Sequence, residues 1–174
     1  MFERFSSEAR EIFAGAQRVA EGEASATVDP LHLLTALART TGVLTALGCP
    51  ADELADDLRR VRRRGGMSDA DVEALSGFGI DVEHIVERVE QSHGEGALSG
   101  VVRSKRGYRP FTQESKKVLE KSLRETVEVG DKRIDAEHVL LALTSLPGVA
   151  ADVLAQRGID YLAVRRLVEG RAAS

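Results

Sequence analysis

The sequence predicts an all-α protein, a tandem repeat in which one four-helix unit occurs twice with pseudo-two-fold symmetry and a partly helical connector joins the copies. First, the segments 28–43 and 134–149 match at one constant offset, as His32 and His138 show (138 − 32 = 106). Such self-similarity indicates a repeat architecture. Second, apolar residues recur at helical spacing in both segments. Third, 43% of the chain is hydrophobic but only 4% is aromatic, so the core must be largely aliphatic, as in packed helices.

The first unit should cover residues 1–64. Ser6 and Asp29 are predicted N-caps, because short polar side chains accept hydrogen bonds from the free N–H groups of a helix start. Pro30 follows Asp29 at the first helical position, where its missing N–H costs nothing. The four expected helices span residues 6–21, 29–39, 43–47 and 52–64.

The second unit should cover residues 111–169. Thr112 and Asp135 occupy the corresponding cap positions, and Gly158 suits the end of a helix. We expect the residues after Glu169 to form a frayed tail. The expected helices are one that follows Thr112 and those over 135–144, 149–157 and 160–169.

The connector should span residues 65–110. Ser68 and Asp71 have the spacing of a capping box, which predicts a short helix over 69–75. Apolar residues at i, i+3, i+4 and i+7 predict a helix over 82–92; they are Val82, Ile85, Val86 and Val89. The glycine-rich, basic stretch 94–109 is expected to be a mobile loop.

Composition excludes several classes of protein. The net charge of −4 is too small to indicate a partner. The single cysteine, Cys49, excludes an internal disulfide and a cysteine-based zinc site, and we expect it to be buried. We expect no cofactor and no metal. The sequence shows no signal peptide and no apolar run near 18 residues, so a cytoplasmic protein without membrane contact is expected.

Residues 111–125 (Phe-Thr-Gln-Glu-Ser-Lys-Lys-Val-Leu-Glu-Lys-Ser-Leu-Arg-Glu), with Glu137-His138 and Pro147-Gly148, resemble the Clp N-terminal repeat. This is the amino-terminal domain of ClpA, ClpB and ClpC-type unfoldases. The opening Met-Phe-Glu-Arg-Phe-Ser is similar to the start of an actinobacterial ClpC. The resemblance covers about residues 1–64 and 110–169, and the connector is longer than in a typical ClpC and similar to the spacer of small stand-alone Clp N-domain proteins.

The resemblance implies a docking module for substrates and adaptor proteins. The sequence lacks the G-x-x-x-x-G-K-[ST] phosphate loop, so we expect a non-enzymatic chain that keeps the docking domain without the ATPase domain. The implied partners are a ClpC-type unfoldase, its substrates or its adaptor proteins. The expected role is to modulate or buffer the Clp unfoldase–protease system.

The resemblance also implies two classes of site. In ClpC-type domains a glutamate of a Gly-Thr-Glu-His motif binds phosphorylated arginine. Leu31 takes its place in the first unit, whereas Glu137 keeps it in the second. Glu137 is therefore either a residual phosphoarginine-type site or a first-turn carboxylate that the helix N-terminus favours.

A groove between the starts of the first helices of the two units binds cyclic-peptide inhibitors in ClpC-type domains. The chain would therefore also be able to sequester cyclic-peptide natural products. The alternative is that the phenylalanines only staple the starts of their helices. The corresponding residues are Phe2, Arg10, Phe13, Gln17, Pro110, Phe111, Lys116 and Glu120.

Two further features have competing interpretations. His32 and His138 occupy identical contexts, which favours a structural role over metal binding, since no further His or Cys ligands cluster near them. The arginine cluster, defined as Arg59, Arg60, Arg62, Arg63 and Arg64, and the basic loop residues Arg103, Lys105, Arg106 and Arg109 allow an alternative function, a nucleic-acid-binding regulator. The competing interpretation of the arginine cluster is favourable charge at a helix C-terminus.

Overall fold

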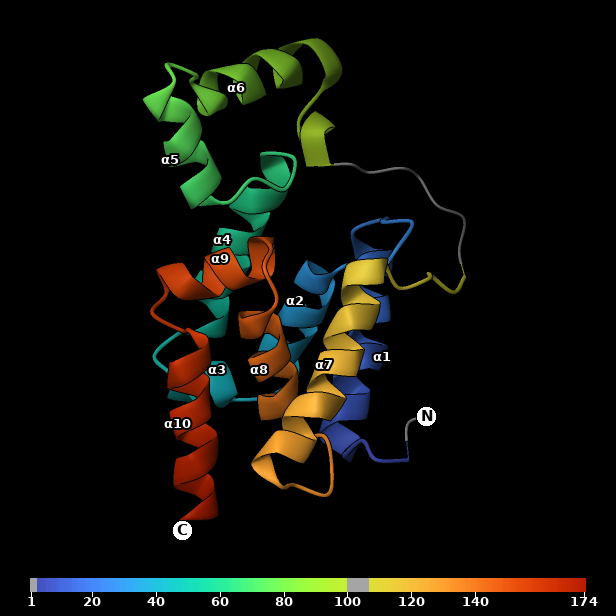
Figure 1. The fold of residues 1–174 in the computed structure, drawn as a ribbon. Helices are drawn as coiled ribbons and strands as arrows, with labels where there is room; N and C mark the ends of the chain where they lie inside the picture. Colours follow the sequence, from blue (N-terminus) through green and yellow to red (C-terminus); the bar gives the residue numbers. More distant parts are fainter. Residues whose placement is uncertain (1–2, 100–106) are drawn as a thin grey trace.

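The computed structural model describes residues 3–99 and 107–174 of the chain. Over this part every longer regular element is a helix, and the β-pairing is limited to two isolated bridges, which confirms the predicted all-α class (Figure 1). The elements are α1 (Ser7–Gly22), α2 (Pro30–Thr40), α3 (Val43–Ala46), α4 (Ala51–Arg63), α5 (Asp69–Gly77), α6 (Val82–His93), the 3-10 helix η1 (Ala97–Ser99), α7 (Gln113–Val129), α8 (Ala136–Ser145), α9 (Val149–Gln156) and α10 (Tyr161–Ala172).

Short polar side chains begin the helices where the sequence predicts them. Ser6 Oγ accepts a hydrogen bond from the Ala9 N–H at 3.1 Å, and Thr112 Oγ1 accepts one from the Ser115 N–H at 3.2 Å. Each such cap stabilises a helix by typically about 1 kcal/mol. The caps recur at the repeat offset, so α1 and α7 begin at equivalent places.

The two units are joined by reciprocal backbone pairing. Phe5 forms an isolated parallel bridge with Ile134, with flanking hydrogen bonds of 3.0 and 2.8 Å. Phe111 forms the equivalent bridge with Val28, with flanking hydrogen bonds of 2.9 and 2.9 Å. Since Phe111 corresponds to Phe5 and Ile134 to Val28, exchanging the two units exchanges the two bridges. The pseudo-two-fold relation is therefore a property of the backbone hydrogen bonds.

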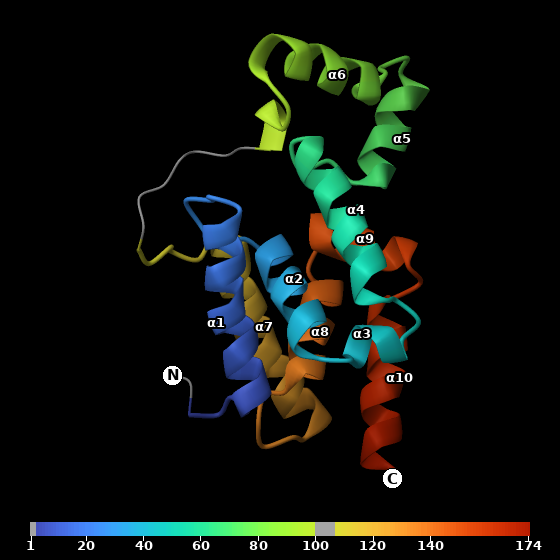
Figure 2. The same ribbon diagram turned by 180° about the vertical axis from the view of Figure 1, so that it is seen from behind.

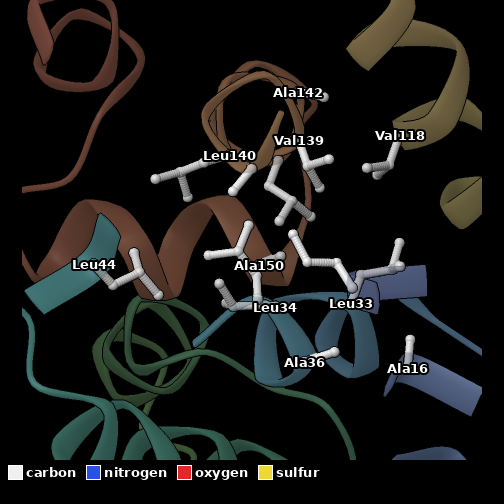
Figure 3. Packing of buried hydrophobic residues seen from close by; sticks show 14 of the residues in the cluster. Ala16, Leu33, Leu34, Ala36, Leu44, Val118, Val139, Leu140, Ala142 and Ala150 are labelled. Carbon is white, nitrogen blue, oxygen red and sulfur yellow. The ribbon is translucent and has the colours of Figure 1, made fainter. Parts of the chain in front are cut away.

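The core lies between the second helices of the two units. Leu33 and Leu34 of α2 point towards Val139 and Leu140 of α8, and all four are fully buried (Figure 3). Burying such a side chain contributes about 1.5–3 kcal/mol. Aliphatic side chains thus fill the interior shared by both units.

Small residues set the distance between α1 and α2. A Cβ added at Gly15 would lie 3.3 Å from the Cβ of Ala36, which is tighter than ordinary van der Waals contact. The two helices therefore pack closely because neither presents a bulky side chain at this point.

The connector forms an arm at one end of the helical body. Figures 1 and 2 show α5 and α6 projecting beyond α4 and α9. On α6, Val82 and Val86 are buried, but Ile85 is 48% exposed, so the predicted apolar stripe is only partly covered. The expected mobile loop of 94–109 contains η1, and its residues 100–106 lie outside the described residues.

The expectation of a frayed tail after Glu169 is wrong, because α10 continues to Ala172. Arg171 contacts Asp131 at 2.9 Å and Glu137 at 3.1 Å, measured between guanidinium nitrogen and carboxylate oxygen. These ion pairs attach the last turn of α10 to the start of α8, which explains why the helix persists.

Candidate functional site

The starts of α1 and α7 are linked by an aromatic cluster of Phe5, Phe13 and Phe111. The ring centroids of Phe5 and Phe13 are 5.5 Å apart in an edge-to-face arrangement, and those of Phe13 and Phe111 are 6.0 Å apart. Phe5 and Phe13 are buried, whereas Phe111 is half-buried. Phe111 therefore packs against Phe13 of the other unit in a tilted arrangement and presents part of its ring at the surface.

This geometry bears on the staple interpretation. In a hydrophobic staple, the residue before the N-cap packs on the fourth residue of its own helix. For Phe111 that residue is the exposed Lys116, and the ring partner of Phe111 is instead Phe13 of α1. The packing across the two units favours a shared surface. We name this surface the α1–α7 groove, after its two helices and after the groove that the resemblance implies.

Polar contacts fix the edges of the α1–α7 groove. Gln17 Nε2 donates to the Arg109 backbone O at 2.7 Å, and the Arg109 N–H donates to Gln17 Oε1 at 3.1 Å. The Arg10 guanidinium donates twice to the Phe5 backbone O, at 3.2 and 3.1 Å. Gln17 thus holds the chain just before Phe111, and Arg10 braces the start of α1.

The remaining groove residues are more exposed. Pro110, Lys116 and Glu120 are exposed, and Lys116 and Glu120 share one face of α7 because they are four residues apart. Phe2 lies outside the described residues. Of the predicted groove set, the structure brings Phe13, Gln17 and Phe111 together around one spot.

Glu137, the candidate phosphoarginine-type residue, already has a guanidinium partner within the chain. Arg171 Nη1 lies 3.1 Å from Glu137 Oε1, and the same side chain approaches Asp135 Oδ2 at 3.7 Å. The equivalent residue of the first unit, Leu31, is buried at 6% exposure. An incoming cationic group would therefore compete with Arg171 at Glu137 and would find no carboxylate at Leu31.

The two histidines cap their own helices. The Asp29 N–H donates to His32 Nδ1 at 2.9 Å, and the Asp135 N–H donates to His138 Nδ1 at 2.9 Å. Both side chains are buried. Within the described residues, no three His, Cys, Asp or Glu side chains are grouped to hold a metal ion. The capping contacts account for both histidines in structural terms.

Each residue of the arginine cluster at the end of α4 forms an ion pair with a carboxylate of the chain. Arg62 contacts both Asp29 oxygens, at 2.5 and 2.8 Å, and Arg63 Nη2 lies 2.9 Å from Glu90 Oε2. The other three arginines pair with neighbouring carboxylates: Arg59 with Asp56, Arg60 with Asp57 and Asp69, and Arg64 with Asp69 and Glu83.

These pairs favour the structural interpretation of the arginine cluster, since its charge is largely neutralised locally. Arg109 of the basic loop is also buried, and its guanidinium donates to the Ser25 and Gly107 carbonyls at 2.6 and 2.9 Å. The basic loop residues 103, 105 and 106 lie outside the described residues.

Sequence analysis did not identify one feature that both units share. In each unit, an arginine of the fourth helix forms ion pairs with carboxylates at the start of the second helix. Arg62 of α4 reaches Asp29, and Arg171 of α10 reaches Glu137 and approaches Asp135. The two arginines are 109 positions apart (171 − 62 = 109), so a search at the repeat offset of 106 does not pair them. The N-caps Pro50 and Asp160 and the buried Leu54 and Val164 are 110 positions apart, so even an alignment of the two fourth helices places Arg171 opposite Val61 rather than Arg62.

Neither the single cysteine nor the apolar helices provide a further candidate site among the described residues. Cys49 is fully buried, and burial raises the pKa of its thiol. Among the described residues, no single helix is long and apolar enough to cross a bilayer, and α8 with α9 meets that test only as a pair bent by 102°.

Comparisons with solved structures agree with the fold. The chain superimposes on the N-terminal domain of the chaperone ClpD from Arabidopsis thaliana with a TM-score of 0.58 and 20% identity, covering 100% of this chain and 97% of that one. The Hsp104 N-terminal domain from Candida albicans gives a TM-score of 0.55 and 20% identity, covering 95% and 89%.

Sequence relatives are much longer proteins. The chain is 39% identical over 95 residues to the chloroplastic chaperone ClpC1 of Arabidopsis thaliana, which is 54% of this chain and 10% of that protein. A ClpA homolog of Guillardia theta is 38% identical over 95 residues, or 54% and 11%. The chain thus spans about a tenth of the length of these relatives.

The Clp repeat (R) N-terminal domain family matches residues 4–157 and, in a second match, 110–173. The chain therefore belongs to the family of Clp repeat N-terminal domains.

Proposed function

We propose that this Clp N-domain binds polypeptides through the α1–α7 groove and thereby modulates or buffers a ClpC-type unfoldase–protease system. Its ligands would be substrates or adaptor proteins of the unfoldase. The chain contributes no catalysis in this role, and the sequence carries no phosphate loop for ATP.

The half-buried ring of Phe111 carries this proposal. Its ring centroid lies 6.0 Å from that of Phe13 in the other unit, and the Gln17 side chain holds the backbone just before it. An anchored aromatic ring presents apolar area at little further entropic cost, which is typical of residues that dominate binding energy. Lys116 and Glu120 next to it would add polar contacts at the rim.

The α1–α7 groove would also take compact cyclic peptides, which lose little conformational freedom on binding. A chain with this groove would sequester cyclic-peptide antibiotics that target the N-domain of ClpC. The same surface would then serve two classes of ligand, and each would displace the other.

Calorimetric titration with such a cyclic peptide tests the groove. Phe111→Ala should weaken binding about tenfold or more, as loss of a hot-spot aromatic does. Phe78→Ala is the matched control, since Phe78 lies on the arm and is 86% exposed. Equal affinity of the wild type and Phe111→Ala would reject the groove.

A degradation assay tests the partner. Adding the chain to a ClpC-type unfoldase–protease with an unfolded reporter should change the degradation rate, and Phe111→Ala should weaken this effect. No change at a large molar excess of the chain would reject modulation of Clp proteolysis.

A further inference from the structure

The corner of the arm, where α5 turns into α6, exposes a group of large apolar side chains. Phe78 is 86% exposed, Ile85 48% and Ile80 40%. Seven large hydrophobic side chains are exposed among the described residues, and these three lie within eight consecutive positions. Single exposed apolar residues are normal on a protein surface, whereas a group of them marks an interaction site. We name the surface formed by Phe78, Ile80 and Ile85 the arm patch.

The arm has little interior of its own. No residue of α5, which lies wholly in the described part of the chain, is buried. α6 buries Val82 and Val86, but neither belongs to the hydrophobic core that the two units share. Figures 1 and 2 show the reason, since α6 runs sideways from the end of α5 rather than back along it. The arm therefore has an apolar face that a third helix would cover.

The arm is also acidic. Seven carboxylates and one arginine lie between Asp69 and His93. Asp69, Glu83 and Glu90 form ion pairs with arginines at the end of α4. The other four carboxylates form no ion pair with a described residue and leave the arm with an excess of negative charge. They are Asp71, Glu73, Asp81 and Glu87.

This charge decides which partner suits the arm patch. Asp81 directly follows Ile80 and lies one helical turn before Ile85, so a carboxylate borders the patch. In a symmetric contact between two copies, each Asp81 would approach the same acidic surface of the other copy, and the like charges would oppose the contact. An anionic membrane would be repelled for the same reason. A partner with lysine or arginine beside its apolar residues is instead attracted by both features.

We propose that the arm patch binds an amphipathic helix of a partner protein, one that carries lysine or arginine beside its apolar face. The apolar face covers Phe78, Ile80 and Ile85 and completes the interior that α5 and α6 lack. The basic side chains lie against the unpaired carboxylates of the arm and set the orientation of the helix. The arm patch shares no residue with the α1–α7 groove, so this interaction is independent of the proposed function.

Fluorescence polarisation of the full chain with a labelled basic probe tests the proposal. The probe is the amidated peptide Leu-Lys-Lys-Leu-Leu-Lys-Leu-Leu-Lys-Lys-Leu-Leu-Lys-Leu, whose leucines form one face of a helix. The same peptide with every Lys replaced by Glu should bind at least about tenfold more weakly, because the arm repels it. A peptide of the same composition with its leucines spread around the helix should also bind about tenfold more weakly.

A double variant and a matched control locate the site. Phe78→Ser/Ile80→Ser should weaken binding of the basic probe about tenfold or more, because it removes two apolar contacts. Both side chains are exposed, so the variant should fold like the wild type, and circular dichroism checks this. Leu162→Ser is the matched control, since Leu162 is 59% exposed but lies on α10, and it should bind like the wild type.

Charge variants separate a local contact from the net charge of the chain. Glu73→Gln/Glu87→Gln removes two unpaired carboxylates of the arm and should weaken binding of the basic probe several-fold, with a shallower dependence on salt. Glu114→Gln/Glu128→Gln removes the same charge from exposed positions of α7 and should leave the affinity unchanged. Equal weakening by both double variants would contradict a contact at the arm.

The proposal is overturned if the basic probe does not bind saturably up to about 1 mM, if the acidic probe binds equally well, or if Phe78→Ser/Ile80→Ser binds like the wild type. Sedimentation velocity addresses a second copy as the occupant. A concentration-dependent dimer that Phe78→Ser/Ile80→Ser abolishes would also overturn the proposal. Phe111→Ala should bind the basic probe normally, so failure of the α1–α7 groove would leave these results unchanged.

Discussion

Asp29 and His32 hydrogen-bond to each other twice at the start of α2. The His32 N–H donates to Asp29 Oδ1 at 3.1 Å, and the Asp29 N–H donates to His32 Nδ1 at 2.9 Å. The far ring nitrogen, Nε2, lies 3.1 Å from Glu23 Oε2. His32 therefore has a carboxylate near each ring nitrogen, since Asp29 Oδ1 is also 3.0 Å from Nδ1.

His138 has one such neighbour, Asp131, at 3.0 Å from Nε2, and Arg171 stands close by. Burial alone would lower the pKa of His32, but hydrogen bonds to Asp29 and Glu23 outweigh burial and raise the pKa. Burial lowers the pKa of His138, and Asp131 and Asp135 offset it only in part. Thus the pKa values of the two equivalent histidines are shifted in opposite directions from the ordinary value.

Stability should depend on pH through both histidines with opposite signs. The His32 contribution is complete below the ordinary pKa of about 6.5 and is lost as pH rises through the raised pKa. The His138 contribution is complete above that value and is lost as pH falls towards the lowered pKa. Urea unfolding at about pH 5.5 and about pH 8 should show that His138→Gln gains relative stability in acid and His32→Gln loses it. A shift of both variants in the same direction would contradict this assignment.

Removing Arg62 should destabilise the fold by about 1–3 kcal/mol, because it leaves the partly buried Asp29 carboxylate without its bidentate partner. Burial alone would raise the pKa of Asp29, yet hydrogen bonds from His32 and Arg62 hold that pKa well below its usual range. Chemical denaturation of Arg62→Ala measures the loss. Arg59→Ala is the control and should change stability by less than about 1 kcal/mol, since Arg59 and Asp56 are both largely exposed.

Gln17→Ala should loosen the backbone just before Phe111. The side-chain amide makes two hydrogen bonds to the Arg109 main chain, at 2.7 and 3.1 Å, and each contributes about 0.5–1.5 kcal/mol. Hydrogen exchange over residues 107–112 should become faster, with weaker ligand binding at the α1–α7 groove. Gln113→Ala, at an exposed position of α7, should leave both unchanged. Unchanged exchange in Gln17→Ala would show that the aromatic contacts alone hold this segment.

The arm should detach more readily at high salt. Arg63 pairs with Glu90 and Arg64 with Glu83 across α4 and α6, and these contacts are partly exposed. Exposed pairs are weak, and salt screens them. Hydrogen exchange of α6 should therefore accelerate at about 1 M salt, while that of α8 in the core should not. Arg63→Ala should reproduce the effect at low salt, and Arg88→Ala should not.

The helix starts were predictable from sequence because they depend on local chemistry. Ser6, Asp29 and Thr112 cap their helices through hydrogen bonds to residues three positions further along. At the repeat offset Ser6 corresponds to Thr112 and Asp29 to Asp135, so each cap position occurs once in each unit. Contacts between distant segments were not predictable in this way. The pairing of Gln17 with Arg109 joins residues that no pattern relates. The pocket lined by Leu31, Val118 and Leu143 likewise depends on how the two units sit together, which periodicity does not encode.

The exposure of single residues also depended on tertiary packing. Ile85 fits the apolar period of α6, yet it is 48% exposed, because the neighbouring elements α5 and η1 cover only part of that helix. Arg171 lies in a stretch with the composition of a tail, yet its guanidinium finds carboxylates on the loop before α8. In both cases the deciding neighbour lies on a different element.

The reciprocal bridges of Phe5 with Ile134 and Phe111 with Val28 mean that the covalent link is not what holds the halves together. A proteolytic nick within the arm would leave two fragments, each still hydrogen-bonded to its counterpart. The same interlocking would let two molecules trade halves, because each half would find an identical acceptor in a second copy. The architecture therefore favours fragment complementation and permits domain swapping.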